Sequence, residues 1–221
     1  MKKHKLEVDS IVLHYGQKSV LSDIYLKCET GDIVGVLGRN GCGKSSLLKI
    51  IFGSLRSEHS SVRINHRYTP CSFRETNGVQ YLPQNGYLTS ASKVEKVIKL
   101  FVLNKDHQQL ILSDRNIKSF RSARVKELST GTRKFLEVML LLYSESKFVL
   151  LDEPFSGVSP IMIEQLFMHL KHQAKNKGVI ITDHLYEHIV DISSKLMLLK
   201  DGRILNINGK EDLVESGYLM D

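Results

Sequence analysis

The chain has 221 residues, of which 42% are hydrophobic and 25% are charged, and its formal net charge is +7. This composition is ordinary for a globular protein and excludes a disordered, collagen-like or fibrous chain, and the length suffices for one large domain or two small ones. The longest apolar run covers residues 138–143, far short of the roughly 20 residues that a membrane-spanning helix needs. A basic balance fits nucleic acid, an anionic membrane surface or solubility alone, so charge does not select a partner.

The cysteines and the N-terminus indicate the compartment. Cys28, Cys42 and Cys71 lie far apart and form no CxxC pair. An odd number of cysteines without CxxC spacing favours reduced thiols over a disulfide framework or a zinc site. The basic first residues are followed by Glu7 and Asp9, which interrupt the apolar run that a secretory signal requires. We therefore expect a cytosolic protein.

Strands dominate the first third of the chain, and the hydrophobic pattern predicts them over residues 6–13, 20–28, 33–37, 62–65 and 79–82. The first is broken near Asp9 and Ser10. Residues 33–37 are almost entirely apolar, which is typical of a strand buried on both faces. Residues 44–52 predict a helix, for which Gly53 supplies the stop signal.

The character of the chain changes after about residue 92. Apolar residues recur at helical spacing until about residue 145, as at Val94, Val97 and Ile98. Beyond that point strands and helices alternate. The predicted strands cover residues 148–151, 179–182, 195–199 and 203–207, and the helices cover 161–173 and 185–192. This alternation implies an α/β fold with a largely parallel sheet covered by helices, and the central helical stretch indicates an inserted subdomain.

Residues 38–45 read GRNGCGKS and match the phosphate-binding loop G-x-x-x-x-G-K-[ST]. Glycines let the backbone curl so that several N–H groups converge on phosphate oxygens, and the following helix adds its positive end. Lys44 would neutralise the β- and γ-phosphates, the Ser45 hydroxyl would bind Mg²⁺, and Ser46 would donate to the α-phosphate. Cys42 would contribute only its N–H. The predicted nucleotide-binding residues of the loop are Gly38, Arg39, Asn40, Gly41, Cys42, Gly43, Lys44, Ser45 and Ser46.

Two carboxylates follow the apolar strand 148–151. Ligands of open α/β sheets bind at the carboxyl ends of the strands, so Asp152 and Glu153 are expected to face the crevice of the phosphate-binding loop. Asp152 would hold Mg²⁺ through water, and Glu153 would orient and polarise an attacking water. A strand-end acid pair or a helix cap is the structural alternative.

With these motifs the sequence resembles the ABC-type ATPases, the nucleotide-binding subunits of ATP-binding-cassette systems, over essentially all of its length. The further motifs occur in the order of that family. Tyr15 matches the aromatic residue that stacks on adenine, Gln84 the glutamine that meets Mg²⁺ and the attacking water, and His184 the switch histidine that contacts the γ-phosphate. The segment LSTGT matches the signature normally written LSGGQ, with Ser129, Thr130, Gly131 and Thr132 expected at the nucleotide of a second subunit.

The resemblance implies a P-loop NTPase fold with a mostly parallel core sheet and an N-terminal antiparallel β subdomain. It implies one domain over residues 1–221, in which a helical signature subdomain of about 86–145 is inserted into a RecA-like core of 1–85 and 146–221. The implied catalytic residues are Lys44, Gln84, Glu153 and His184. The implied metal ligands are Ser45, Gln84 and Asp152.

Three positions depart from the family pattern. Thr130 replaces the first glycine of the signature and Thr132 its glutamine, and Ser159 stands where an aspartate is usual. A β-branched side chain next to phosphate costs close approach or imposes strain. Lys44, Asp152, Glu153 and His184 are intact, so we expect ATP binding and hydrolysis, and whether Thr130 and Ser159 weaken turnover stays open.

The resemblance implies an ATP-binding subunit of an ABC transporter that hydrolyses ATP with Mg²⁺ in a head-to-tail dimer with a second nucleotide-binding subunit. The cargo would pass through a separate integral membrane permease, and the chain would be cytoplasmic, on the inner face of the cell membrane. The segment 181–184 is similar to cassettes of lipopolysaccharide-export and branched-chain amino-acid systems. Two alternatives stay open: a soluble ABC-type ATPase acting in iron–sulfur assembly, on ribosomes or on nucleic acid, and a weakly hydrolytic regulatory module.

Two further patterns carry competing predictions. His184 and His188 form the H-x-x-E-H spacing of a zinc site, at the position where the switch histidine is expected. Basic residues gather in 115–134, and nucleic-acid binding would require them to share one face. We expect neither nucleic acid nor a metal cluster as partner. The basic residues are Arg115, Lys118, Arg121, Arg124, Lys126, Arg133 and Lys134.

Overall fold

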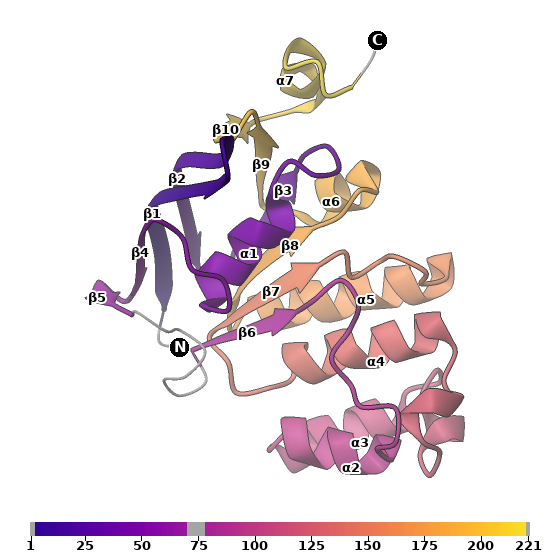
Figure 1. Cartoon of the computed structure of the whole chain (residues 1–221). Coiled ribbons are helices and arrows are strands. Elements are labelled where there is room, and N and C mark those ends of the chain that lie inside the picture. Colours follow the sequence, from indigo (N-terminus) through magenta and orange to yellow (C-terminus); the bar gives the residue numbers. More distant parts are fainter. Residues whose placement is uncertain (1–2, 70–77, 220–221) are drawn as a thin grey trace.

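The computed structural model describes residues 3–69 and 78–219, so that Cys71 lies outside the described residues. Two sheets form the centre of the molecule (Figure 1). The antiparallel sheet has the order β2-β1-β4-β5 and comprises β1 (Lys5–Tyr15), β2 (Lys18–Glu29), β4 (His59–Ile64) and β5 (Arg67–Tyr68). The second sheet has the order β10-β9-β3-β8-β7-β6 and comprises β3 (Ile33–Leu37), β6 (Val79–Leu82), β7 (Phe148–Asp152), β8 (Gly178–Thr182), β9 (Lys195–Lys200) and β10 (Arg203–Ile207).

The second sheet is parallel except at one edge. Strands β3, β6, β7, β8 and β9 run parallel to their neighbours, and β10 pairs antiparallel with β9 around the turn at Asp201 and Gly202. The helices are α1 (Lys44–Phe52), α2 (Val94–Phe101), α3 (Lys105–Ser113), α4 (Thr130–Leu142), α5 (Pro160–Ala174), α6 (Tyr186–Ile192) and α7 (Lys210–Glu215), with 3₁₀ turns η1 (Lys118–Phe120) and η2 (Val125–Glu127). The predicted α/β fold with an antiparallel N-terminal sheet is confirmed.

Strand β3 shows why this sheet lies at the centre. All five of its residues are buried, and their side chains divide between two cores. Ile33 and Leu37 join the core under α4 and α5, whereas Val34 and Val36 join the core between the two sheets. A strand with apolar residues on both faces must be covered on both sides, which is what the continuous apolar run predicts.

The two cores place different helices on the two faces of the central sheet. Helix α1 fills the space between the sheets with Leu47, Leu48 and Ile51. On the opposite face α4 and α5 cover the sheet, and the same buried cluster continues from α4 into α2 and α3. Figure 1 shows α2 and α3 beyond α4, away from the antiparallel sheet. The central helical stretch is thus joined to the sheet through α4.

Local signals in the sequence fix two of these elements. The break predicted near Asp9 and Ser10 is an irregularity within a continuous β1, where Ser10 has φ 55° and the register with β2 shifts. Helix α1 ends at Phe52 because Gly53 adopts φ 92° and donates its N–H to the carbonyls of Lys49 and Ile50. Glycine accepts this left-handed conformation without steric cost.

The sequence did not predict β5 or α7, and it did not separate α3 from the rest of the central helical stretch. Strand β5 has two residues, α7 has six, and α3 lies within the stretch predicted only as helical. The two residues of β5 and the six of α7 carry too few periods of hydrophobicity to be detected. Within residues 3–69 and 78–219, helices fall short of the length and apolar character needed to cross a bilayer.

Candidate functional site

The phosphate-binding loop joins the end of β3 to the start of α1, as its sequence context predicts. Its glycines are required by close contacts. A Cβ atom on Gly38 would lie 2.6 Å from Cys42 Sγ and 2.7 Å from the Leu199 carbonyl oxygen. Gly43 has φ 111°, and a Cβ atom there would lie 2.9 Å from Val20 Cγ1. The loop is therefore curled tightly between β2 and β9, and its N–H groups precede the helix N-terminus where anions bind.

Lys44 is buried at the start of α1. Its ammonium donates to the carbonyl oxygens of Gly38 at 2.6 Å and Arg39 at 3.2 Å. A buried ammonium needs such partners because desolvation is costly. The first turn of the loop thereby holds the lysine next to the space that the loop encloses.

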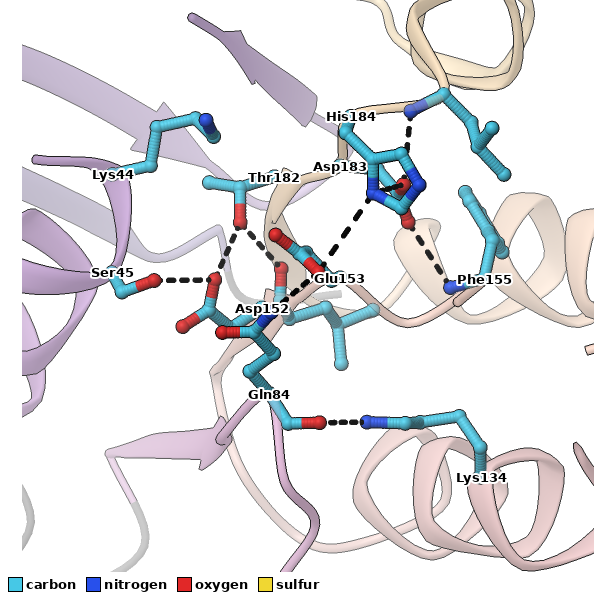
Figure 2. A network of polar contacts seen from close by, with 12 residues as sticks. Lys44, Ser45, Gln84, Lys134, Asp152, Glu153, Phe155, Thr182, Asp183 and His184 are labelled. Carbon is cyan, nitrogen blue, oxygen red and sulfur yellow. Dashed lines mark hydrogen bonds and ion pairs between the residues drawn. The ribbon is translucent and has the colours of Figure 1, made fainter. Parts of the chain in front are cut away.

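Asp152 faces the loop from the carboxyl end of β7, as predicted (Figure 2). Ser45 Oγ donates to Asp152 Oδ1 at 3.1 Å, and Thr182 Oγ1 donates to the same oxygen at 2.9 Å. Tyr81 Oη donates to Oδ2 at 3.0 Å, and burial, followed by the neighbouring Asp152, raises the pKa of Tyr81, so the phenol keeps its proton. Sequence reasoning did not assign Thr182 or Tyr81 to the site.

Glu153 stands beside Asp152 in an unusual backbone conformation. Its φ is 50°, in the left-handed region that a non-glycine residue enters at a cost of about 1–3 kcal/mol. Its N–H donates to the Thr182 carbonyl oxygen at 2.8 Å, which ties this turn to β8. Gln84 Nε2 donates to Glu153 Oε2 at 2.8 Å, and His184 Nδ1 lies 3.8 Å from that oxygen. The predicted residues Gln84, Glu153 and His184 therefore meet at one carboxylate (Figure 2).

Asp183 anchors the segment that carries His184. Its side chain is fully buried and accepts from the N–H groups of Phe155 at 3.2 Å and Leu185 at 3.0 Å. Asp183 Oδ1 also lies 3.3 Å from His184 Nδ1. One carboxylate thus connects the loop after Glu153 with the loop that presents the histidine.

Lys134 of α4 holds the backbone of Gln84. Its buried ammonium donates to the Gln84 carbonyl oxygen at 2.6 Å, and burial lowers the pKa of Lys134. Its neighbour Arg133 donates to Glu137 at 3.2 Å and to the Leu88 carbonyl oxygen at 2.6 Å. Two of the seven basic residues in 115–134 are therefore engaged inside the subunit, which argues against a single basic face.

A cavity of about 500 Å³ opens over the phosphate-binding loop. It brings the loop together with Tyr15, which is 56% exposed at the end of β1, and with Lys18, which sequence reasoning missed. The lining residues are Tyr15, Lys18, Val20, Asn40, Gly41, Gly43, Lys44, Ser45, Ser46, Gln84, Glu153 and His184. Arg39 and Cys42, predicted with the loop, line a separate smaller cavity instead.

The signature residues lie outside this cavity. Ser129 and Thr130 are exposed at the start of α4, where Ser129 Oγ accepts from the Thr132 N–H at 3.1 Å and pairs with its hydroxyl at 2.8 Å. Gly131 packs on the loop before α5, because a Cβ atom would lie 2.6 Å from the Gly157 carbonyl oxygen. Thr132 is buried, so its side chain serves the helix cap of its own subunit.

The two histidines of the H-x-x-E-H spacing have different surroundings. His184 faces Glu153 and Asp183, whereas the ring of His188 packs edge-on against Phe155 and Phe167 at centroid distances of 5.7 and 5.8 Å. Among the described residues, no group of three or more His, Cys, Asp and Glu side chains is arranged to hold a metal ion. The two histidines therefore face different surroundings in the described structure.

Known proteins are similar to this chain over nearly its whole length. The model of the ABC transporter family matches residues 21–156, which contain the loop and both carboxylates. The lipopolysaccharide export system ATP-binding protein LptB of Acidithiobacillus ferridurans is 28% identical, with 95% of this chain and 92% of the relative covered. An uncharacterised ABC transporter ATP-binding protein of Rhizobium meliloti is 30% identical, with 90% of this chain and 78% of the relative covered.

A solved structure of an ATP-binding subunit of an ABC transporter has the same fold. Its TM-score is 0.83 at 21% identity, and 98% of this chain and 95% of that chain are covered. Since the family model covers more than half of the chain and the relatives extend over nearly all of it, the chain belongs to the ABC transporter family, as an ATP-binding subunit that hydrolyses ATP.

Proposed function

We propose that ATP binds in the cavity over the phosphate-binding loop and is hydrolysed there by residues 84, 153 and 184. The observation that carries the proposal is the approach of Ser45 to Asp152, 3.1 Å between hydroxyl and carboxylate oxygens. It sets Asp152 directly against the phosphate-binding loop, while the neighbouring Glu153 lines the cavity. Lys44 would stabilise the charge on the β- and γ-phosphates, and Tyr15 would stack on adenine at the open end.

The oxygen donors at this point fit a magnesium ion. Mg²⁺ prefers hard oxygen ligands and usually keeps several waters, so one hydroxyl and one carboxylate suffice as protein ligands. Ser45 and Asp152 would hold the ion, with Gln84 next to them at Glu153. When bound, Mg²⁺ neutralises charge on the β- and γ-phosphate oxygens. Thr182 and Tyr81 keep the Asp152 carboxylate oriented by donating to both of its oxygens.

Glu153 is the proposed general base. A base must lie within hydrogen-bond reach of the water whose proton it accepts, and it must be oriented. Gln84 donates to Glu153 at 2.8 Å, and His184 lies beside the same carboxylate, on the side of the cavity where the γ-phosphate would end. In this arrangement Gln84 and Glu153 position water, and His184 contacts the γ-phosphate.

The exposed signature supports a head-to-tail dimer. Ser129 and Thr130 lie on the surface and not in their own cavity, so a second subunit would present its signature, from its helical subdomain of about 86–145, to the nucleotide held here. Ser159 precedes α5 as its N-cap residue, makes no side-chain cap hydrogen bond, and would lie in the loop that crosses this interface. Because Thr130 is exposed at the first position of α4, its side chain would meet the second subunit's nucleotide.

A separate integral membrane permease is the proposed second partner. The relatives named for lipopolysaccharide export are ATP-binding proteins of export systems, and they match this chain over nearly its full length. The energy of ATP binding and hydrolysis would drive transport through that partner. The chain would then act on the cytoplasmic face of the membrane.

Phosphate release by the purified chain tests the proposal. Glu153→Gln removes the base but keeps the shape, so the rate should fall by about 10²-fold or more while ATP still binds. Glu187→Gln is the matched control, because it makes the same charge change on an exposed residue of α6. Undiminished phosphate release from Glu153→Gln would show that another group is the base.

A further inference from the structure

The C-terminal segment lies against the outer side of the phosphate-binding loop. Helix α7 ends at Glu215, and the residues that follow it reach Arg39 of the phosphate-binding loop. Arg39 Nη2 donates to the Gly217 carbonyl oxygen at 3.0 Å. Lys200 of β9 donates to the neighbouring Ser216 carbonyl oxygen at 2.8 Å. Arg39 of the loop thus contacts this segment beside a cavity that is separate from the nucleotide cavity.

This segment, residues 216–218, has a fixed conformation. Gly217 adopts φ 67° and donates its N–H to the Val214 carbonyl oxygen at 2.8 Å. Tyr218 donates its N–H to the Leu213 carbonyl oxygen at 2.9 Å. Leu213 is buried, and the Tyr218 side chain packs against the same core. Hydrogen bonds and core packing therefore hold the segment in place next to the loop.

A cavity of about 180 Å³ lies between the segment and the loop, lined by Arg39, Cys42, Leu199, Gly217 and Tyr218 among others. Burial raises the pKa of Tyr218, and a contact with the Gly38 backbone acts in the opposite direction. The tyrosine hydroxyl therefore approaches the first residue of the loop. Gly38 and Arg39 are both contacted from the C-terminal side.

The same two residues hold Lys44. The carbonyl oxygens of Gly38 and Arg39 accept from Lys44 Nζ at 2.6 and 3.2 Å. A displacement of these peptides would move the ammonium that has to meet the phosphates. Residues 216–218 thus contact the residues that hold Lys44, the proposed phosphate-binding lysine, and not Lys44 itself.

We propose that residues 216–218 form a positioning element of the nucleotide site, which fixes Gly38 and Arg39 and through them directs Lys44 at the phosphates. The inference rests on the proposed nucleotide site. It assigns Arg39 a role towards its own C-terminus rather than towards ATP. Coupling between two sites is reciprocal, so ATP binding must also steady residues 216–218.

Steady-state ATP hydrolysis by the full chain separates this role from a general loss of stability. Arg39→Ala breaks the contact with Gly217 and should raise the KM for ATP about fivefold, with kcat within twofold of the wild type. Arg39→Lys keeps a cation that can donate to the same carbonyl and should give an intermediate KM. Lys175→Ala is the control, because it removes an exposed cation at the end of α5, on an element other than the loop and residues 216–218, and its KM should stay at the wild-type value.

Hydrogen exchange supplies the second readout. In the wild type, ATP·Mg²⁺ should slow amide exchange in residues 213–219 by several-fold, and Arg39→Ala should abolish this protection. If Arg39→Ala folds poorly, Tyr218→Phe replaces it, since only the hydroxyl next to Gly38 is lost.

An unchanged KM in Arg39→Ala, or an equal rise in Lys175→Ala, overturns the inference while leaving the proposed nucleotide site intact. Absence of ATP binding in the wild type would overturn both.

Discussion

At the scale of single residues, several charged side chains are buried among the described residues, and Asp152 and Lys177 show two different ways of holding one. Asp152 is 1% exposed, and Ser45, Tyr81 and Thr182 donate to its oxygens. Lys177, also buried, donates to the Ser144 carbonyl oxygen at 2.8 Å. Asp152 is surrounded by donors, whereas Lys177 has one accepting partner, so burial weighs more heavily on the lysine.

Lys177 should make stability depend on pH. Burial lowers its pKa from 10.5 to about 8, so between these values the folded chain has lost a proton that the unfolded chain keeps. Unfolding then takes up a proton, and the free energy of unfolding rises with pH over this window. The full range corresponds to roughly 3 kcal/mol, at about 1.4 kcal/mol for each pH unit.

Chemical denaturation at pH 7 and pH 10 measures this effect. The wild type should gain stability relative to Lys177→Met as the pH rises, because the variant lacks the buried ammonium. Lys175→Met makes the same charge change at an exposed position and should follow the wild type. Parallel pH profiles for the wild type and Lys177→Met would contradict the assignment.

The sequence predicted those site residues whose roles follow from local motifs. Lys44, Ser45 and Glu153 line one cavity, and Asp152 contacts Ser45 beside it, because the loop and the acids both follow buried strands of one parallel sheet. Tyr81, Thr182 and Lys134 escaped prediction as site residues. Their contacts with Asp152 and Gln84 join separate elements, and a pattern within one segment does not report such tertiary contacts.

At the scale of elements, α6 packs directly on the backbone of β3. A Cβ atom on Gly35 would lie 2.3 Å from Ser193 Oγ and 2.5 Å from Ile189 Cγ2. Helix α6 follows the loop that carries His184, and β3 leads into the phosphate-binding loop. Because Gly35 has no side chain, α6 can pack closely on β3. This packing sets the distance between the two elements that flank the site.

Gly35→Ala should destabilise the protein by about 1–3 kcal/mol, the usual cost of overpacking a tight core. Urea denaturation measures the free energy of unfolding directly. Gly209→Ala is the control, since nothing lies within 4 Å of its Cβ position and its backbone is extended. Equal stabilities of the two variants would mean that α6 can move away from β3 at little cost.

Element prediction succeeded where the hydrophobic pattern was long or the stop signal was strong. Strand β3 and helix α1 have the bounds that the sequence predicts, because one is an unbroken apolar run and the other ends at a glycine. Helix α7 was not predicted, since six residues give less than two helical turns. The C-terminal contacts with Arg39 depend on that helix and were therefore invisible in the sequence.

At the scale of the whole molecule, the nucleotide cavity and the signature lie on different parts of one subunit. Ser129 and Thr130 are exposed at the start of α4, and the cavity is lined by β1, the phosphate-binding loop and the loops after β6, β7 and β8. A subunit of this design has half of each proposed ATP site. Two copies placed head to tail would complete both.

Glu153→Gln should therefore form a dimer with ATP and Mg²⁺, because ATP that is not hydrolysed keeps the two subunits together. Light scattering coupled to size-exclusion chromatography should give twice 25.1 kDa with ATP·Mg²⁺ and 25.1 kDa without it. Adding Thr130→Gly should strengthen the dimer if the threonine side chain obstructs closure. A monomer under saturating ATP·Mg²⁺ would argue against the head-to-tail arrangement.

Calorimetric titration with ATP·Mg²⁺ tests most directly whether the phosphate-binding loop is the nucleotide site. The wild type should bind, and Lys44→Ala should bind at least tenfold more weakly, since the ammonium beside the loop is lost. Lys49→Ala, an exposed lysine on the same helix, should bind as the wild type does. Equal ATP affinity of Lys44→Ala and the wild type would contradict the assignment of the loop as the phosphate site.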